Sequence, residues 1–478
     1  MESRNWIGGG WSKPEAGTLE IRNPSDLAKT VGYVHLSSKA DLFAAVDAAR
    51  SAQPKWAAMT GAARGECLYR MAGLLEAHGA ELAKLASAEM GKPIVEMRGE
   101  VARGVHLLRY YAAEGVRANG QMIPSSFANV KQYSVRVPIG VAAVITPWNF
   151  PVAIPIWKIA PALICGNTVV WKPAENGCLT AVKLAEIFAE AELPAGTLNL
   201  IIGKGSIVGQ ALLAEAAIDA ISFTGSSATG LRVAAASAAR NLKYQTEMGG
   251  KNAAVILRDA DLDAAVAAVV SGAFRSAGQK CTATSRVIVE RTVYDEFASK
   301  TAEAMAKLRI ANAMNEGAYL GPVASLEQFN TVNGYVGTAL AEATIAAVGP
   351  GAEGEGEGYY ISPLLVEGVS AEHPLVQEEV FGPLAVMLPA DNIDEAIGLV
   401  NRTVFGLSAS VFTRSLNDAF RFLDEAEAGM VRVNQETGGV EYQAPFGGMK
   451  DSSSHSREQG QSALDFYTHL KTCAIQYR

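Results

Sequence analysis

The chain has 478 residues, of which 49% are hydrophobic and 19% are charged. Its 41 lysines and arginines against 49 aspartates and glutamates leave a formal net charge of −8, and no long basic run could neutralise a row of phosphates. These values exclude a small stapled scaffold and argue against a nucleic-acid partner. We expect a globular protein of roughly two to four domains that acts on a small molecule.

The cysteines and the amino terminus indicate a reducing compartment. The five cysteines stand far apart without CxxC spacing, so the sequence predicts neither a disulfide framework nor a metal site. Residues 1–14 are polar and glycine-rich rather than a basic stretch followed by an apolar one, unlike a secretory signal. We therefore expect a cytoplasmic protein.

Helical periodicity dominates residues 41–117, where apolar side chains recur three or four residues apart. This spacing predicts a run of amphipathic helices. In residues 137–171 the only charged side chain is Lys158, but prolines interrupt the segment. Because no unbroken apolar helix of membrane-spanning length fits there, a buried strand–helix–strand unit is the better prediction.

Residues 140–248 alternate short apolar runs with helix-length segments, which is typical of a parallel doubly wound sheet. The expected strands are 141–145, 168–171, 198–202, 220–223 and 244–246. A second α/β block follows, with a glycine-rich excursion at 349–358. The predicted fold class is α/β, with two doubly wound lobes and a cleft between them.

Two alternating runs lie outside these lobes. Residues 133–137 alternate apolar and polar side chains and predict a half-buried strand, and residues 464–478 hold a second such run. We expect the second run to pair with the 130–137 strand of another subunit. The predicted divisions are a dinucleotide-binding domain (1–116 and 139–248), a catalytic domain (249–450) and oligomerisation segments (117–138 and 451–478).

Three features suggest where the chemistry occurs. Residues 223–230 form a glycine-containing loop between a strand and a helix, where backbone N–H groups could hold a pyrophosphate, although plain turns share this pattern. Glu175 follows the second strand, where a carboxylate could bind the ribose of a dinucleotide or simply lie on the surface. Cys281 lies in a polar loop, a setting that suits a reactive thiol. The histidines have no recognisable motif, so a Cys–His protease arrangement has little support.

Several segments together resemble the aldehyde dehydrogenase superfamily, in the family's order and spacing over nearly the whole chain. They are Thr146–Pro151, Lys172–Glu175, Phe223–Ser226, Glu247–Asn252, Gly278–Cys281, Glu378–Pro383 and Pro445–Lys450. The resemblance implies oxidation of an aldehyde with NAD or NADP bound in a variant of the Rossmann arrangement, without a metal. Residues 278–284 and 445–458 most resemble the α-ketoglutarate semialdehyde (2,5-dioxopentanoate) dehydrogenase branch.

The resemblance also implies catalytic roles. Cys281 would attack the aldehyde to give a thiohemiacetal and then a thioester. The Asn149 side-chain amide and the Cys281 backbone N–H would stabilise the oxyanion. Glu247 would activate water, which favours hydrolysis to a free acid over transfer to coenzyme A. Glu458 and Lys158 would relay protons to and from that base.

The resemblance also implies a set of cofactor contacts and an assembly of several subunits. The implied contacts are Trp148 and Lys172 near the adenosine, Glu175 on its ribose, Gly225 and Ser226 at the pyrophosphate, Gly249 nearby, Glu379 on the nicotinamide ribose and Phe381 beside the nicotinamide. Because a carboxylate repels a 2′-phosphate, Glu175 predicts a preference for NAD, with NADP possible. Similar proteins form homodimers or homotetramers.

The substrate is less defined by the sequence. Phe150, Trp157 and Tyr442 would line an apolar channel, and Arg103 would face it to receive an anionic group, unless it pairs with Glu100 or Glu441 instead. Alternative substrates are succinate semialdehyde and pyridine- or benzaldehyde-type aldehydes. A non-catalytic binding or structural protein on the same fold is a remote alternative, against which the presence of Cys281, Glu247 and Asn149 argues.

Overall fold

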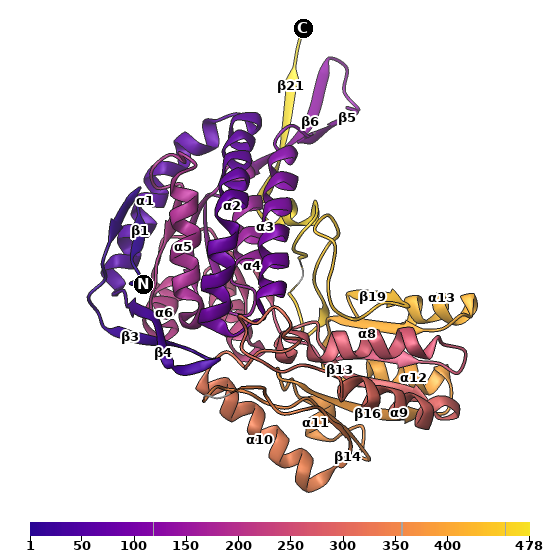
Figure 1. Ribbon diagram of the computed structural model, residues 1–478. Helices are drawn as coiled ribbons and strands as arrows, with labels where there is room; N and C mark the ends of the chain where they lie inside the picture. Colours follow the sequence, from indigo (N-terminus) through magenta and orange to yellow (C-terminus); the bar gives the residue numbers. More distant parts are fainter. Residues whose placement is uncertain (118, 355–356, 455) are drawn as a thin grey trace.

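The computed structural model describes residues 1–478 apart from 118, 355–356 and 455. Part of the expected glycine-rich excursion, at 355–356, and His455 of the C-terminal motif therefore lie outside the described residues. Two seven-stranded sheets organise most of the chain, and Figure 1 shows them in two separate lobes. This arrangement confirms the predicted α/β fold class with two doubly wound lobes.

The first sheet has the strand order β11-β10-β7-β8-β9-β1-β2. Strands β7 to β11 are parallel, and β1 runs antiparallel to β9 and β2. The strand order reverses at β7, and such a reversal leaves a crevice at the carboxyl ends of the strands. The strands are β1 (Asn5–Ile7), β2 (Gly10–Ser12), β7 (Val141–Thr146), β8 (Thr168–Pro173), β9 (Leu198–Leu200), β10 (Ala220–Thr224) and β11 (Lys243–Glu247).

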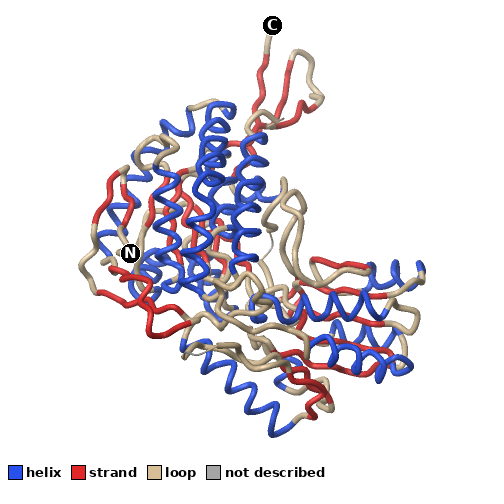
Figure 2. Tube along the Cα trace, viewed as in Figure 1, coloured by secondary structure: helices blue, strands red, loops and turns tan. Residues whose placement is uncertain are grey.

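Side chains of the central strands alternate between two cores because successive residues point to opposite faces of a sheet. Val144 and Trp171 pack with helices α2 to α5, whereas Ala143 and Val170 pack with α1, α6 and α7. Figure 2 shows the long helices lying against the strands of this sheet. The helices are α1 (Lys39–Ala58), α2 (Gly61–Met90), α3 (Ile94–Glu114), α4 (Ala153–Ile164), α5 (Cys178–Ala189), α6 (Gln210–Ala214) and α7 (Ser227–Ala239).

The second sheet has the order β14-β15-β16-β13-β12-β18-β19 and is parallel except for β14. One core packs α8 and α9 on it, and a second packs α10 to α13. Its strands are β12 (Asn252–Ile256), β13 (Thr284–Glu290), β14 (Thr344–Val348), β15 (Leu364–Glu367), β16 (Leu384–Ala390), β18 (Ser408–Phe412) and β19 (Met430–Val433). Its helices are α8 (Leu262–Phe274), α9 (Tyr294–Met305), α10 (Leu326–Glu342), α11 (Pro374–Gln377), α12 (Ile393–Asn401) and α13 (Leu416–Glu425).

A three-stranded arm extends away from the lobes (Figure 1). It has the order β21-β6-β5, from β5 (Gly120–Ile123), β6 (Val130–Pro138) and β21 (Thr468–Gln476). The expectation that the C-terminal run pairs with the 130–137 strand of another subunit is wrong. Both edges of β6 are already paired within the same chain, by β5 and by β21.

Smaller elements complete the chain. They are the hairpin β3 (Thr18–Asn23) and β4 (Asp26–His35), the pair β17 (Phe405–Gly406) and β20 (Met449–Lys450), and α14 (Ser462–Phe466). The predicted buried unit at 137–171 forms β7, α4 and β8, and no helix in the described part of the chain is long and apolar enough to cross a membrane.

Candidate active site

A cavity of about 220 Å³ lies at the carboxyl ends of β7, β10 and β11 and is lined by loops from both lobes. It brings together residues that the sequence analysis singled out from five separate segments. These are Trp148, Asn149, Gly225, Ser226, Gly249, Cys281, Glu379 and Phe381. The crevice expected at a reversal of strand order therefore contains both the candidate nucleophile and most of the candidate cofactor residues.

The side chain of Asn149 is held against the Cys281 loop. Asn149 is buried, and its Nδ2 donates to the backbone oxygen of Gln279 at 2.9 Å. A side-chain amide has two N–H donors, so one remains for another acceptor. On the Cys281 side, Asn252 Nδ2 donates to the Cys281 carbonyl at 2.8 Å. The amide and the Cys281 backbone are thus fixed next to each other.

The loop before Cys281 has a strained backbone. Ser276 and Ala277 have left-handed φ values of 56° and 53°, which cost energy for residues other than glycine. Glu96 accepts from Ser276 N at 3.0 Å and from its Oγ at 2.6 Å, and Gln279 Oε1 accepts from Ala324 N at 3.0 Å. These contacts hold the loop in one conformation.

The loop that carries Cys281 is polar in sequence but packed in the structure. Cys281 lies against an apolar cluster that contains Leu407 and Phe446. Burial, with the nearby carboxylates of Glu379 and Glu247, raises the pKa of the Cys281 thiol above its usual range. The thiol therefore needs a base or a nearby positive charge before it can act as a nucleophile.

Glu247 ends β11 and is almost fully buried. Ser453 Oγ donates to its Oε2 at 2.5 Å, and its Oε1 has no hydrogen-bond partner among the described residues. Burial, and then repulsion from Glu458, raise the pKa of Glu247 well above its usual range. A carboxylate with a raised pKa and a free oxygen is a stronger proton acceptor than an ordinary carboxylate once it has ionised.

Lys158 and Glu458 form a buried ion pair rather than surface charges. Trp157 Nε1 donates to the other oxygen of Glu458 at 2.6 Å, and Lys158 Nζ donates to Ser222 Oγ at 2.9 Å. All of these side chains are buried, and the charge of Glu458 contributes to the raised pKa of Glu247.

The two residues expected at the nicotinamide, Glu379 and Phe381, line the same cavity. Trp148, which was expected near the adenosine, lies beside Phe381 and makes an edge-on ring contact with centroids 5.6 Å apart. Glu379 accepts from Gly250 N at 3.1 Å, and burial raises its pKa to about 7. Gly249 lies beside this carboxylate, which a Cβ at that position would displace.

The residues expected at the phosphates follow β10, and Lys172 and Glu175 lie at the end of β8, on the other side of β7. The Ser226 side chain does not accept from a backbone N–H of α7, so backbone N–H groups remain at the start of that helix. Helix N-termini of this kind bind phosphates. Lys172 and Glu175 lie outside the cavity lining; Glu175 Oε1 accepts from Gly205 N at 2.8 Å and lies 3.9 Å from Lys172 Nζ. The backbone N–H groups at the start of α7 could hold a phosphate of a dinucleotide.

None of the residues expected around the substrate lines this cavity. Trp157 contacts Phe446, with ring centroids 5.4 Å apart. Tyr442 stacks on His106 of α3 at 5.9 Å. Phe150 lies under Lys92, whose Nζ is 3.5 Å from the ring centroid.

Arg103 makes neither of the ion pairs considered from the sequence. Glu100 pairs with Lys92 at 2.7 Å, and Glu441 accepts from Gln443. Arg103 Nη2 instead donates to Gln459 Oε1 at 2.9 Å. Its Nε, and the Nε2 of Gln459, are buried without a partner in the described part of the chain.

Several residues near the site were missed by the sequence analysis. They are Ser453 against Glu247, Gln328 of α10 in the cavity lining, and Lys92, Glu96 and Glu100 around the start of α3. Ser453 lies in a run of serines just after the Pro445–Lys450 motif, and this position in the sequence could have indicated a residue near the site. The others depend on contacts between segments far apart in the chain.

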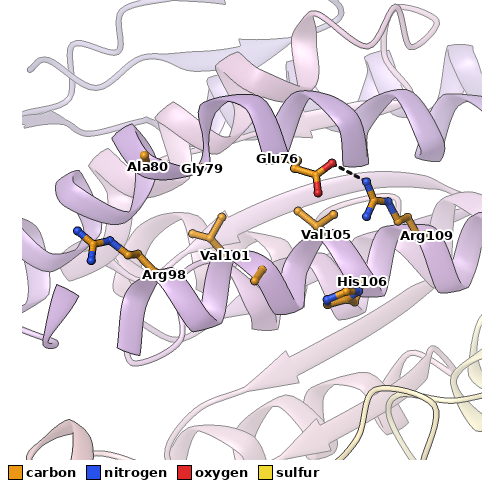
Figure 3. A pocket seen from close by; sticks show the side chains of 9 residues that line it. Glu76, Gly79, Ala80, Arg98, Val101, Val105, His106 and Arg109 are labelled. Carbon is orange, nitrogen blue, oxygen red and sulfur yellow. Dashed lines mark hydrogen bonds and ion pairs between the residues drawn. The ribbon is translucent and has the colours of Figure 1, made fainter. Parts of the chain in front are cut away.

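A second hollow, of about 260 Å³, lies between α2 and α3 (Figure 3). It is lined by Val101, Val105 and His106 and by the exposed ion pair of Arg109 with Glu76. None of its lining residues belongs to the predicted site, and no described set of three or more His, Cys, Asp or Glu side chains could bind a metal.

Comparisons with known proteins agree with this geometry. A family model described as "Aldehyde dehydrogenase family" matches residues 11–473. The chain therefore belongs to the aldehyde dehydrogenase family and is an enzyme of that class, as its motifs predicted.

Individual relatives cover almost the whole chain. An alpha-ketoglutaric semialdehyde dehydrogenase of Bacillus subtilis is 46% identical over 99% of this chain and 98% of its own. An alpha-ketoglutarate semialdehyde dehydrogenase of Haloferax volcanii is 39% identical over 99% of both. The crystal structure of betaine aldehyde dehydrogenase from Staphylococcus aureus in complex with NAD+ has a TM-score of 0.95 and 32% identity, over 99% of this chain and 94% of that one.

Proposed function

We propose that this enzyme uses NAD to oxidise a semialdehyde, 2,5-dioxopentanoate, to the corresponding carboxylic acid. The observation that carries the proposal is the cavity that joins the Cys281 thiol and the Asn149 amide, with Glu247 just behind its lining. The names of the Bacillus and Haloferax relatives support the substrate, and the NAD+ in the Staphylococcus structure supports the cofactor.

In the proposed reaction the Cys281 thiol first loses its proton to water in the cavity, and the thiolate sulfur then bonds to the aldehyde carbon. The carbonyl oxygen becomes an oxyanion that accepts from Asn149 Nδ2 and from the Cys281 N–H. Bound NAD supplies the hydride acceptor. As the oxyanion collapses, hydride leaves the carbon and a thioester remains on Cys281.

Hydrolysis completes the cycle. Glu247 takes a proton from water, and the resulting hydroxide attacks the thioester carbon. The carbon–sulfur bond breaks, the acid leaves and the Cys281 thiolate is restored. Glu458 and Lys158 receive the proton from Glu247, since they form the buried network behind it.

We expect NAD to be preferred over NADP because of Glu175. A carboxylate and a 2′-phosphate at about 4 Å repel each other by roughly 1–4 kcal/mol, depending on solvent exposure. Glu175→Gln should therefore raise kcat/KM for NADP about tenfold or more and change that for NAD less. Steady-state rates with each cofactor test this, with Glu190→Gln on the exposed end of α5 as the matched control. A wild-type preference for NADP would contradict it.

We further propose that Arg103 and Gln459 receive the anionic end of the substrate. Burial lowers the pKa of Arg103, which shows that its charge lies in a partly dry setting. Its hydrogen bond to Gln459 leaves only donors unsatisfied, on Arg103 Nε and Gln459 Nε2. Buried donors without acceptors are costly, and a carboxylate oxygen would satisfy them.

Arg103→Met should lower kcat/KM for 2,5-dioxopentanoate. The loss should correspond to about 1.5–3 kcal/mol of transition-state free energy, which is the usual value of a charged hydrogen bond. Hexanal, which has no anionic end, should be affected little. Arg109→Met is the matched control on the same helix, since Arg109 forms an exposed pair with Glu76. Equal losses for both aldehydes would leave Arg103 with a structural role, and a benzaldehyde-type substrate faster than every semialdehyde would contradict the substrate itself.

We also propose that the arm joins two copies of this chain in a homodimer or homotetramer. Phe127 is 73% exposed and Leu470 is 65% exposed, although both are apolar. Such side chains on an extended arm are typical of an interface. Light scattering of the wild type should give a mass that is a multiple of the chain mass. Leu470→Asp should lower the measured mass. Leu416→Asp, at an exposed site on α13, should not; a monomeric wild type would contradict the proposal.

A further inference from the structure

We propose that Lys92, Glu96 and Glu100, at the start of α3, act as positioning residues that set the separation between the Asn149 amide and the Cys281 loop. We call these three residues the α3 clamp. The inference rests on the proposed function, because it assigns the clamp a role in assembling the oxyanion site of that reaction. No residue of the clamp lines the cavity, so its effect on catalysis acts through Asn149 and Cys281.

Two members of the clamp hold the turn that carries Asn149. Lys92 Nζ donates to the Asn149 carbonyl at 2.9 Å and to Glu100 Oε2 at 2.7 Å. The other oxygen of Glu100 accepts from Val152 N at 2.8 Å and from Ala153 N at 2.9 Å. The backbone on both sides of the turn is therefore bonded to one buried ion pair.

The third member holds the Cys281 loop of the other lobe. The Glu96 carboxylate accepts from both the backbone N and the Oγ of Ser276. Ser276 begins the left-handed stretch that leads to Cys281, and such a conformation persists only where its surroundings fix it. Glu96 and Glu100 are four residues apart and so share one face of the helix. One rigid element thus contacts both halves of the oxyanion site.

Stability alone does not explain the buried pair of Lys92 and Glu100, in which both side chains are only 2% exposed. Removing two charges from water is costly, and apolar replacements of similar volume are often as stable. What the charges provide is directed hydrogen bonds to three backbone atoms around Asn149, which are Asn149 O, Val152 N and Ala153 N. Orientation of this kind matters for catalysis, since a shift of about 1 Å can cost about 100-fold in rate.

A double-mutant cycle with Asn149→Ala tests the proposal. The paired replacement Lys92→Met with Glu100→Gln removes both charges together and keeps a carbonyl acceptor for the N–H groups of α4. We expect kcat for the aldehyde that the wild type oxidises fastest to fall about 10- to 100-fold, with little change in KM or in the Kd for NAD. In the Asn149→Ala background the same replacement should change kcat by less than about twofold, because the group it positions is absent.

Glu96→Ala provides a second cycle that leaves no buried charge unpaired, in case the paired replacement does not fold. Arg98→Met is the control on the same helix, since Arg98 forms an exposed pair with Glu316, and it should leave kcat unchanged. Equal losses of kcat in both backgrounds, for the variants that fold, would overturn the positioning role. A wild type that oxidises no aldehyde would instead overturn the proposed function.

Discussion

Cys281→Ala is expected to abolish aldehyde oxidation while leaving NAD binding intact. Without the sulfur no thiohemiacetal forms, and the aldehyde carbon then has no tetrahedral state from which hydride can leave. We expect kcat to fall by at least about 10⁴-fold, to the background of the assay, because loss of a nucleophile commonly costs this much. Stopped-flow absorbance of the reduced cofactor measures the rate, and calorimetric titration measures NAD binding.

The other cysteines provide the controls. Cys165 and Cys178 do not line the cavity, and burial raises the pKa of Cys165 to about 12 and that of Cys178 well above its usual range, so neither thiol should react with the substrate. Cys473→Ala, on the arm, should leave the rate unchanged. Radiolabelled substrate trapped on Cys165 or Cys178, or substantial turnover by Cys281→Ala, would contradict the assignment.

Glu247→Gln is expected to form the acyl-enzyme and then stall. Glutamine can still accept from Ser453 Oγ at the position of Oε2, but it cannot take a proton from water. One equivalent of reduced cofactor should therefore appear rapidly, followed by a steady state about 10²–10⁴-fold slower than in the wild type. A variant without a burst, or with an unchanged steady state, would show that another group activates water.

The pH profile should change in the same variant. Glu247 must be deprotonated to act, and burial and Glu458 raise its pKa well above the usual range. Wild-type kcat should therefore rise with pH until that carboxyl has ionised and then level off. Glu247→Gln should lose the rising limb, because the titrating group has been removed; a limb that persists would belong to a different carboxyl.

The sequence predicted the parts of the fold that depend on local patterns. Strands β7 and β8 are buried on both faces, so they are continuous apolar runs and were found within one or two residues. The three-residue strands β1 and β2 are too short to show any alternation and were missed. The pairing partner of β21 was assigned to the wrong chain, because an alternating pattern defines a strand but does not identify its neighbour.

The sequence predicted the site residues that lie in short motifs. It missed the residues that reach the site through contacts between distant segments. Cys281, Asn149 and Glu379 lie in short motifs and line one cavity in the structure. Their roles remain predictions. Lys92 lies 57 positions from Asn149 in the chain, so no local pattern indicates that contact. The raised pKa of Cys281 likewise depends on burial that a polar loop sequence does not reveal.

The arm has a consequence for how the protein is made. Thr468 of β21 pairs with Pro138 of β6, so the contact spans 468 − 138 = 330 positions of the chain. A ribosome at about 5–20 residues per second needs roughly 15–70 seconds to add those positions, during which one edge of β6 has no partner from its own chain. Unpaired edges attract other strands. Completion of the arm therefore waits until β21 has been made, and a chain that stops before β21 cannot present a finished arm to another molecule.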